Sequence, residues 1–136
     1  MPRASVWFIR TALIYLALGF TFGGLLLFNK AVPILPVLWG LLPIHVEFVL
    51  AGWTFNLALG MAYWILPRFV QGPPRGDVRL IGLAYVLLNA GVLVASTAAV
   101  LPTTGAGLLL AGRAAELLSA VVFACHAWPR VRPMNM

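Results

Sequence analysis

Long apolar stretches separated by short polar ones are the dominant pattern of this chain. A helix needs about 20 apolar residues to cross the hydrocarbon core of a bilayer, which is about 30 Å thick. Four stretches reach that length, and they lie at residues 8–28, 42–66, 80–101 and 105–128. Pro67, Pro102 and Pro129 follow the last three of them. Because proline lacks an N–H and clashes with the preceding turn, it ends a helix. The pattern therefore predicts four transmembrane helices.

These four helices use nearly the whole chain, so we expect one transmembrane domain over residues 1–136. The expected fold is all-α, an integral membrane four-helix bundle with up-down-up-down order. The first stretch is too long for a signal peptide, and Phe28, Asn29 and Lys30 stand where a small-residue cleavage site would be needed. The apolar, proline-broken segment 29–43 is expected to lie in the outer membrane interface.

Composition supports a membrane location and excludes most soluble classes. The chain is 62% hydrophobic and 9% charged, whereas a soluble domain is about 45–50% apolar and about 25% charged. So few charged residues cannot cover the surface of a soluble domain of this size. The bilayer is therefore the expected partner of most side chains.

The net charge of +6 arises from nine basic and three acidic residues. Seven of the nine basic residues lie at the two ends of the chain or in the loop 68–79. Because positively charged loops remain in the cytoplasm, both termini and this loop are expected on that side of an inner (cytoplasmic) membrane. The basic residues form no clustered patch, so no nucleic-acid partner is expected.

Seven polar residues remain at membrane depth, where ionisable groups are costly and commonly functional. They are His45, Glu47, Asn56, Asn89, Arg113, Glu116 and His126. On a helical wheel of about 100° per residue, Gly52 and Asn56 lie within about 40° of His45. A histidine above a glycine-floored strip leaves room for a flat ligand such as haem, for which imidazole is a usual axial ligand. A histidine bonded to a neighbouring helix or to interfacial water is the alternative.

The second apolar stretch also carries a family resemblance. The residues concerned are His45, Gly52-Trp53, Gly60 followed by Tyr63, and Pro67-Arg68. This pattern resembles the second transmembrane helix of the main subunit of the haem–copper oxidase superfamily, particularly its nitric oxide reductase and cbb3-type branch. Gly19, Gly23 and Gly24 are compatible with the first helix of that family. The resemblance implies that His45 is an axial ligand, and hence the iron ligand, of a haem b.

This chain departs from that family in size and in histidine content. It has two histidines, so it lacks the copper-binding trio, and catalysis by this chain alone is not expected. His126 lies about 20 residues into its helix, whereas His45 lies near the start of its own. At 1.5 Å per residue their depths differ by about 25 Å, too far for one iron. A two-fold axis along the membrane normal would instead bring two His45 side chains to one haem.

Arg113 and Glu116 lie at i, i+3 and can pair directly, with Glu47 at similar depth. Three interpretations remain open: an interhelical network of these three residues, a role for Arg113 beside a haem propionate, or a proton or cation site using the two glutamates. Asn56 and Asn89 are expected to hydrogen-bond across helices.

The sequence therefore predicts a haem b-binding membrane protein for electron transfer or haem handling, with His45, Gly52, Asn56 and Arg113 at the cofactor. We expect a homodimer or other homo-oligomer and a respiratory-chain partner. The alternatives are a haem-free structural or assembly subunit of an oxidase or nitric oxide reductase, and a small proton or cation transporter.

Overall fold

The computed structural model describes residues 1–33, 35–69, 74–101 and 105–131. Within these ranges the chain has four helical spans that are long and apolar enough to cross a membrane. In chain order the elements are α1 (Arg3–Ala31), η1 (Pro36–Leu41), α2 (Leu42–Glu47), η2 (Phe48–Phe55), α3 (Asn56–Ile65), α4 (Val78–Ala98), α5 (Gly105–Ala127) and η3 (Trp128–Arg130). The all-helical, four-span prediction is confirmed, and these spans fit a multi-pass membrane protein.

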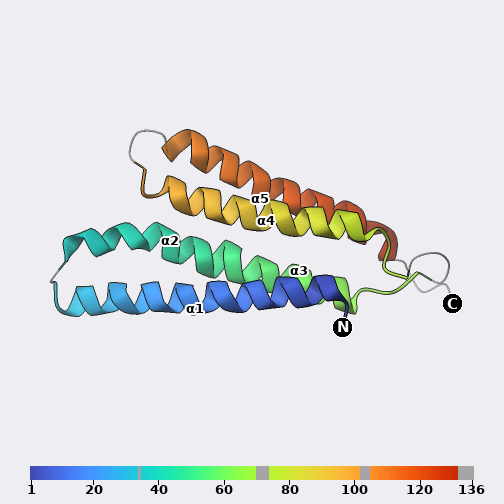
Figure 1. The fold of residues 1–136 in the computed structure, drawn as a ribbon, viewed down its shortest axis with the longest axis horizontal. Coiled ribbons are helices and arrows are strands. Elements are labelled where there is room, and N and C mark those ends of the chain that lie inside the picture. Colours follow the sequence, from blue (N-terminus) through green and yellow to red (C-terminus); the bar gives the residue numbers. More distant parts are fainter. Residues whose placement is uncertain (34, 70–73, 102–104, 132–136) are drawn as a thin grey trace.

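The helices form two hairpins (Figure 1). In the first hairpin α1 packs along the continuous rod of α2, η2 and α3, and in the second α4 packs along α5. The two hairpins meet mainly where α2 and η2 approach α4. Between 17% and 33% of each span's most apolar window is buried inside the protein. Most of the apolar surface therefore needs a lipid solvent, as expected for a bundle in a bilayer.

The helix ends differ from the predicted ranges in several places: α1 runs over Arg3–Ala31 rather than 8–28, whereas α2 begins at Leu42 as predicted. The second span begins at Pro36, because the 3₁₀-helix η1 runs directly into α2, so most of segment 29–43 belongs to helical structure. Proline at the first position of η1 favours this start, since its missing N–H would have no helical partner there. Helix α4 ends at Ala98 rather than Leu101. The expected stop at Pro102 and part of the turn-rich loop, residues 70–73, lie outside the described residues.

The second span contains a π-helical segment, η2, over Phe48–Phe55. A π-helix uses i→i+5 hydrogen bonds, so each residue advances by less than the 100° of an α-helix. The Thr54 hydroxyl donates to the Val49 carbonyl five residues earlier, at 3.0 Å, and follows this wider turn. The wheel that placed Gly52 and Asn56 on the face of His45 assumed a regular α-helix. In the structure His45 and Gly52 both face α1, whereas Asn56 reaches Asn89 of α4.

Glycines let the two arms of the first hairpin approach closely. A Cβ on Gly52 would lie 2.6 Å from Cγ of Tyr15, and one on Gly60 would lie 2.7 Å from Cβ of Phe8. Tyr15 and Phe8 are buried by this contact. Small residues at a helix interface allow dispersion contacts that lipid cannot replace, and this stabilises helix association in a bilayer.

Candidate functional site

His45 lies in α2 and reaches across to α1. Its Nδ1 is 2.8 Å from the backbone oxygen of Gly19. Because a carbonyl can only accept, Nδ1 carries the proton, and in the neutral ring Nε2 is left with a lone pair. The ring lies against Gly23, where an added Cβ would be 2.8 Å from Cε1 of His45. The absence of a side chain at Gly23 therefore leaves space for the imidazole, and the hydrogen bond to the Gly19 carbonyl fixes the tautomer of the ring.

A cavity of about 400 Å³ adjoins this imidazole. Its lining residues are Phe20, Gly23, Gly24, Leu26, Leu27 and His45. A Cβ added at Gly24 would meet no atom within 4 Å, so the space beside this glycine is open. Because Phe20 and Leu27 are largely exposed, this groove, which we name the His45 groove, opens toward the outside of the bundle.

The strip below His45 does not offer the expected space for a flat ligand. The Tyr15 ring occupies the position above Gly52. Asn56 is fully buried, and its amide donates to the Gly52 carbonyl at 2.7 Å. In this structure Gly52 packs against Tyr15 of α1, and Asn56 pairs with Asn89 of α4. Neither residue lines the cavity beside His45, and their place beside a cofactor stays a prediction.

Asn56 and Asn89 form a reciprocal amide pair between α3 and α4. Each side-chain nitrogen donates to the other residue's side-chain oxygen at 3.2 Å. The Asn89 amide also donates to the Tyr85 carbonyl at 2.8 Å. The prediction that these two asparagines hydrogen-bond across helices is confirmed, and the pair joins the two hairpins.

Arg113 on α5 joins Glu47 on α2 to Glu116, one turn farther along α5. Its two terminal nitrogens donate to the two oxygens of Glu47 at 2.9 and 2.6 Å, and one of them also donates to Glu116 at 2.8 Å. The side chain of Glu47 is only 6% exposed and that of Arg113 is 51% exposed. Glu47, Arg113 and Glu116 therefore form an interhelical network, which was the first of the three interpretations left open by the sequence. With both terminal nitrogens engaged, Arg113 is not directed at the His45 groove.

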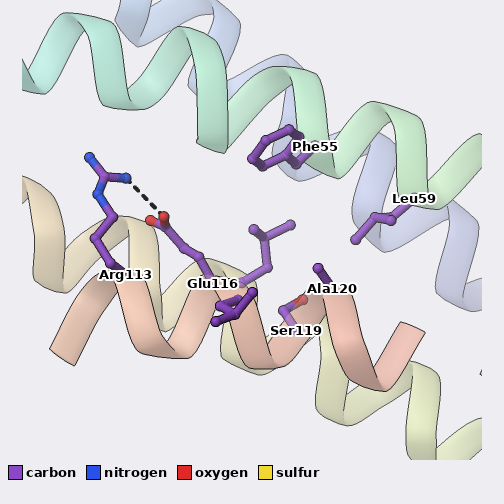
Figure 2. A pocket seen from close by; sticks show the side chains of 8 residues that line it. Phe55, Leu59, Arg113, Glu116, Ser119 and Ala120 are labelled. Atoms are coloured by element: carbon purple, nitrogen blue, oxygen red, sulfur yellow. Dashed lines mark hydrogen bonds and ion pairs between the residues drawn. The ribbon is translucent and has the colours of Figure 1, made fainter. Parts of the chain in front are cut away.

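A second cavity lies between the two hairpins and was not predicted from the sequence. It measures about 460 Å³ and is lined by Phe55, Leu59, Leu88, Arg113, Glu116, Leu117, Ser119 and Ala120. Figure 2 shows Phe55 and Leu59 from the first hairpin facing α5, with Arg113 and Glu116 at one end. We name it the inter-hairpin groove. Only the packing of several helices brings these residues together, so no pattern within a single helix could have predicted this groove.

His126 lies near the end of α5, and this end of α5 is at the opposite end of the bundle from α2, which carries His45 (Figure 1). Its ring centroid is 5.6 Å from that of Tyr63. The inference that the two histidines of one chain cannot share an iron agrees with this placement. Among the described residues no group of three His, Cys, Asp or Glu side chains could hold a metal ion.

Arg130 has a structural role at the end of α3, which the charge pattern of the sequence did not predict. Its guanidinium donates to the backbone oxygens of Tyr63, Leu66 and Pro67 at 3.1, 2.7 and 2.9 Å. The last carbonyls of a helix have no partner within the helix, and a basic side chain can satisfy them. In the sequence, Pro67 just after α3 was the sign that the last carbonyls of this helix would need a donor from elsewhere.

Comparison of this chain with protein-family models, with curated proteins and with solved structures finds no match. The resemblance to the haem–copper oxidase superfamily therefore stays a prediction from the sequence.

Proposed function

We propose that this protein binds haem b in the membrane, with Nε2 of His45 as an axial ligand to the iron. The hydrogen bond from Nδ1 of His45 to the Gly19 carbonyl carries this proposal. Metal-binding histidines almost always donate their other ring N–H to a carbonyl, carboxylate or water, which orients the ring and strengthens the ligand. The cavity beside the ring and the open space at Gly24 give such a ligand somewhere to lie.

The residues of one chain fit one side of a haem. His45 supplies one ligand, and Phe20, Leu26 and Leu27 offer apolar contacts that would exclude water from one face. The groove is open on its outer side, so we propose that a second copy, related by a two-fold axis along the membrane normal, supplies the second His45. Bound haem would supply one-electron redox chemistry, and the protein would set its potential through the ligands and the apolar surroundings.

The orientation belongs to the same proposal. We place the chain in the inner membrane in up-down-up-down order, with both termini in the cytoplasm, because seven of nine basic residues would then lie on that side. His45 would lie in the outer half of the membrane. We propose that a haem at this position would serve in electron transfer or haem handling with a respiratory-chain partner.

Hemin titration of the purified protein tests the proposal. The expected result is a Soret band for the original chain that is lost in His45→Ala and retained in His126→Ala. His126 is the matched control, since it is the chain's other histidine and lies at the opposite end of the bundle.

A second variant separates ligand binding from folding. Gly24→Phe should leave the helices folded, because nothing lies within 4 Å of its Cβ position. It should nevertheless block haem by filling the groove. A colourless original chain after titration, or a Soret band unchanged in His45→Ala, would overturn the proposal and favour a haem-free assembly subunit.

A further inference from the structure

Three arginines lie around the loop that connects the two hairpins, and we name them the loop arginines. Arg68 follows α3, Arg75 precedes α4, and Arg79 lies in the first turn of α4. Arg68 and Arg79 are exposed, and Arg75 is half-buried. Asp77 is the only acidic residue between positions 68 and 79. Positive charge is therefore in excess at the end of the bundle where α3 ends and α4 begins (Figure 1).

A backbone hydrogen bond brings two of the loop arginines near each other. The Phe69 N–H donates to the Pro74 carbonyl at 2.9 Å. Arg68 directly precedes Phe69, and Arg75 directly follows Pro74. The two arginines therefore project from neighbouring stretches of the chain, although seven positions separate them in the sequence.

The part of the loop that leads into α4 is fixed to the helices on either side. Gly76 has a φ of +74° and packs against α5, because a Cβ there would lie 3.2 Å from Cε1 of His126. The Asp77 carboxylate caps α4 by accepting from the Arg79 N–H at 2.8 Å. These contacts hold the backbone that carries Arg75 and Arg79, so little ordering remains to be done when a ligand binds.

The charges of the loop arginines have no carboxylate partner in the part of the chain that the structure describes. The ion pairs found there join Arg113 to Glu47 and Glu116, and none involves a loop arginine. The Asp77 oxygen that caps α4 bonds to the backbone and not to a guanidinium. The loop arginines therefore offer unpaired positive charge to a partner outside the chain.

Large apolar side chains are exposed beside these charges. Trp64 and Ile65, in the last turn of α3, are 43% and 70% exposed, and Val78 at the start of α4 is also exposed. Near the end of a membrane span, such side chains contact lipid while neighbouring arginines reach the headgroup level. Hydrocarbon next to positive charge matches a ligand that carries acyl chains below an anionic group.

We propose that the loop arginines bind the phosphate of an anionic phospholipid, with its acyl chains along Trp64, Ile65 and Val78. A guanidinium donates paired hydrogen bonds to phosphate oxygens, and basic segments next to a span attract anionic lipids. A zwitterionic lipid carries a cationic group that the excess positive charge would repel. This site requires only that the helices span a bilayer, so it does not depend on haem or on orientation.

Titration of the purified protein with phosphatidylglycerol or phosphatidylcholine of identical acyl chains tests this proposal. The protein is kept in neutral detergent micelles, and bound lipids are counted by native mass spectrometry. We expect tighter binding of phosphatidylglycerol. Each basic residue near a membrane surface contributes about 1 kcal/mol, or about fivefold in affinity. Combining Arg68→Gln, Arg75→Gln and Arg79→Gln should therefore weaken phosphatidylglycerol binding by about a hundredfold.

A second variant separates lipid binding from folding. Arg68→Gln with Arg79→Gln changes only exposed residues and should weaken phosphatidylglycerol binding by about 25-fold. Lys30→Gln is the matched control, because Lys30 is an exposed basic residue at the end of α1, on the far side of the bundle (Figure 1).

Three results would overturn the proposal. Equal binding of the two lipids would show that charge does not select the ligand. A double variant that binds phosphatidylglycerol as well as Lys30→Gln does would exclude the loop arginines. Displacement of the lipid by inorganic phosphate at equal concentration would show a site for free anions, in which the acyl chains take no part.

Discussion

Two interfaces of this molecule are built in different ways. Within the first hairpin, contact is largely apolar and close, with Tyr15 lying over Gly52 of the other arm. Between the two hairpins, an apolar cluster that includes Phe8 and Leu88 is joined by polar contacts, above all the ion pair of Glu47 with Arg113 at 2.6 Å. In a bilayer neither interface is driven by the hydrophobic effect, because lipid tails are as apolar as the side chains. Dispersion therefore stabilises both interfaces, and electrostatics add to it where the hairpins meet.

This difference explains where the cavities lie. Close glycine packing leaves little space inside the first hairpin, and what remains is the His45 groove on its outer side. Between the hairpins a groove with mostly apolar walls remains, with Arg113 and Glu116 among its lining residues. The His45 groove thus belongs to the first hairpin alone, whereas the inter-hairpin groove is lined by both hairpins.

The largest effect is expected from removing the guanidinium between the hairpins. Arg113→Leu leaves Glu47 and Glu116 facing each other without a cation, and because the Arg113 side chain is 51% exposed, we expect a cost of about 3 kcal/mol, the lower end for a buried pair. The free energy of unfolding, measured by SDS titration in mixed micelles, should fall by about that amount. Arg79→Leu, which removes an exposed arginine at the start of α4, should change it by less than about 0.5 kcal/mol.

A triple variant sharpens this test. Arg113→Leu combined with Glu47→Gln and Glu116→Gln removes all three charges, and replacing a whole buried ionic cluster is often neutral or stabilising. Most of the lost stability should therefore return. If the single and triple variants are equally unstable, packing rather than charge joins the hairpins at this point.

A smaller loss is expected from crowding the apolar interface. In Gly52→Ala the new Cβ would lie 2.6 Å from the Tyr15 ring, and overpacking of this kind costs about 1–3 kcal/mol. Gly24→Ala is the matched control, because its Cβ position has nothing within 4 Å. Equal thermal stability of the two variants would contradict the close packing of the first hairpin.

The smallest effect is expected from the amide pair between α3 and α4. Hydrogen bonds between transmembrane helices contribute about 0.6 kcal/mol on average. Asn56→Leu and Asn89→Leu should each destabilise the protein by about 1 kcal/mol, because each leaves the other amide unpaired. A double-mutant cycle should show a double variant less destabilised than the sum of the single ones. Strict additivity would mean that the pair contributes nothing to joining the hairpins.

The features that could be predicted from the sequence are those encoded locally or by charge. The apolar stretches define the spans, and Pro67 marks the end of the second one. Arg113 and Glu116 are one helical turn apart, so their pairing follows from spacing, and Glu47 is one of the few acidic residues available to complete it. The partnership of Asn56 with Asn89 follows because a buried amide in lipid needs a partner.

The features that could not be predicted depend on contacts between elements. Nothing in the sequence of Phe48–Phe55 marks a π-helix, and only the packing shows that Asn56 pairs with α4 while His45 and Gly52 face α1. Gly52 fits equally well beneath a flat ligand or beneath an aromatic ring, and only the packing of α1 decides that Tyr15 takes the place. The inter-hairpin groove exists because Phe55 and Glu116, far apart in sequence, face each other across the hairpins.

The most direct test of the proposed haem site is the ratio of haem to protein chain, measured together with the ligation of the iron. A fully titrated sample should be quantified by pyridine haemochrome assay, and the iron examined by electron paramagnetic resonance. Two copies that share one haem through His45 predict about half a haem per chain and a six-coordinate low-spin iron. One five-coordinate haem per chain would contradict the shared site, and a ratio unaffected by His45→Ala would contradict the role of His45 itself.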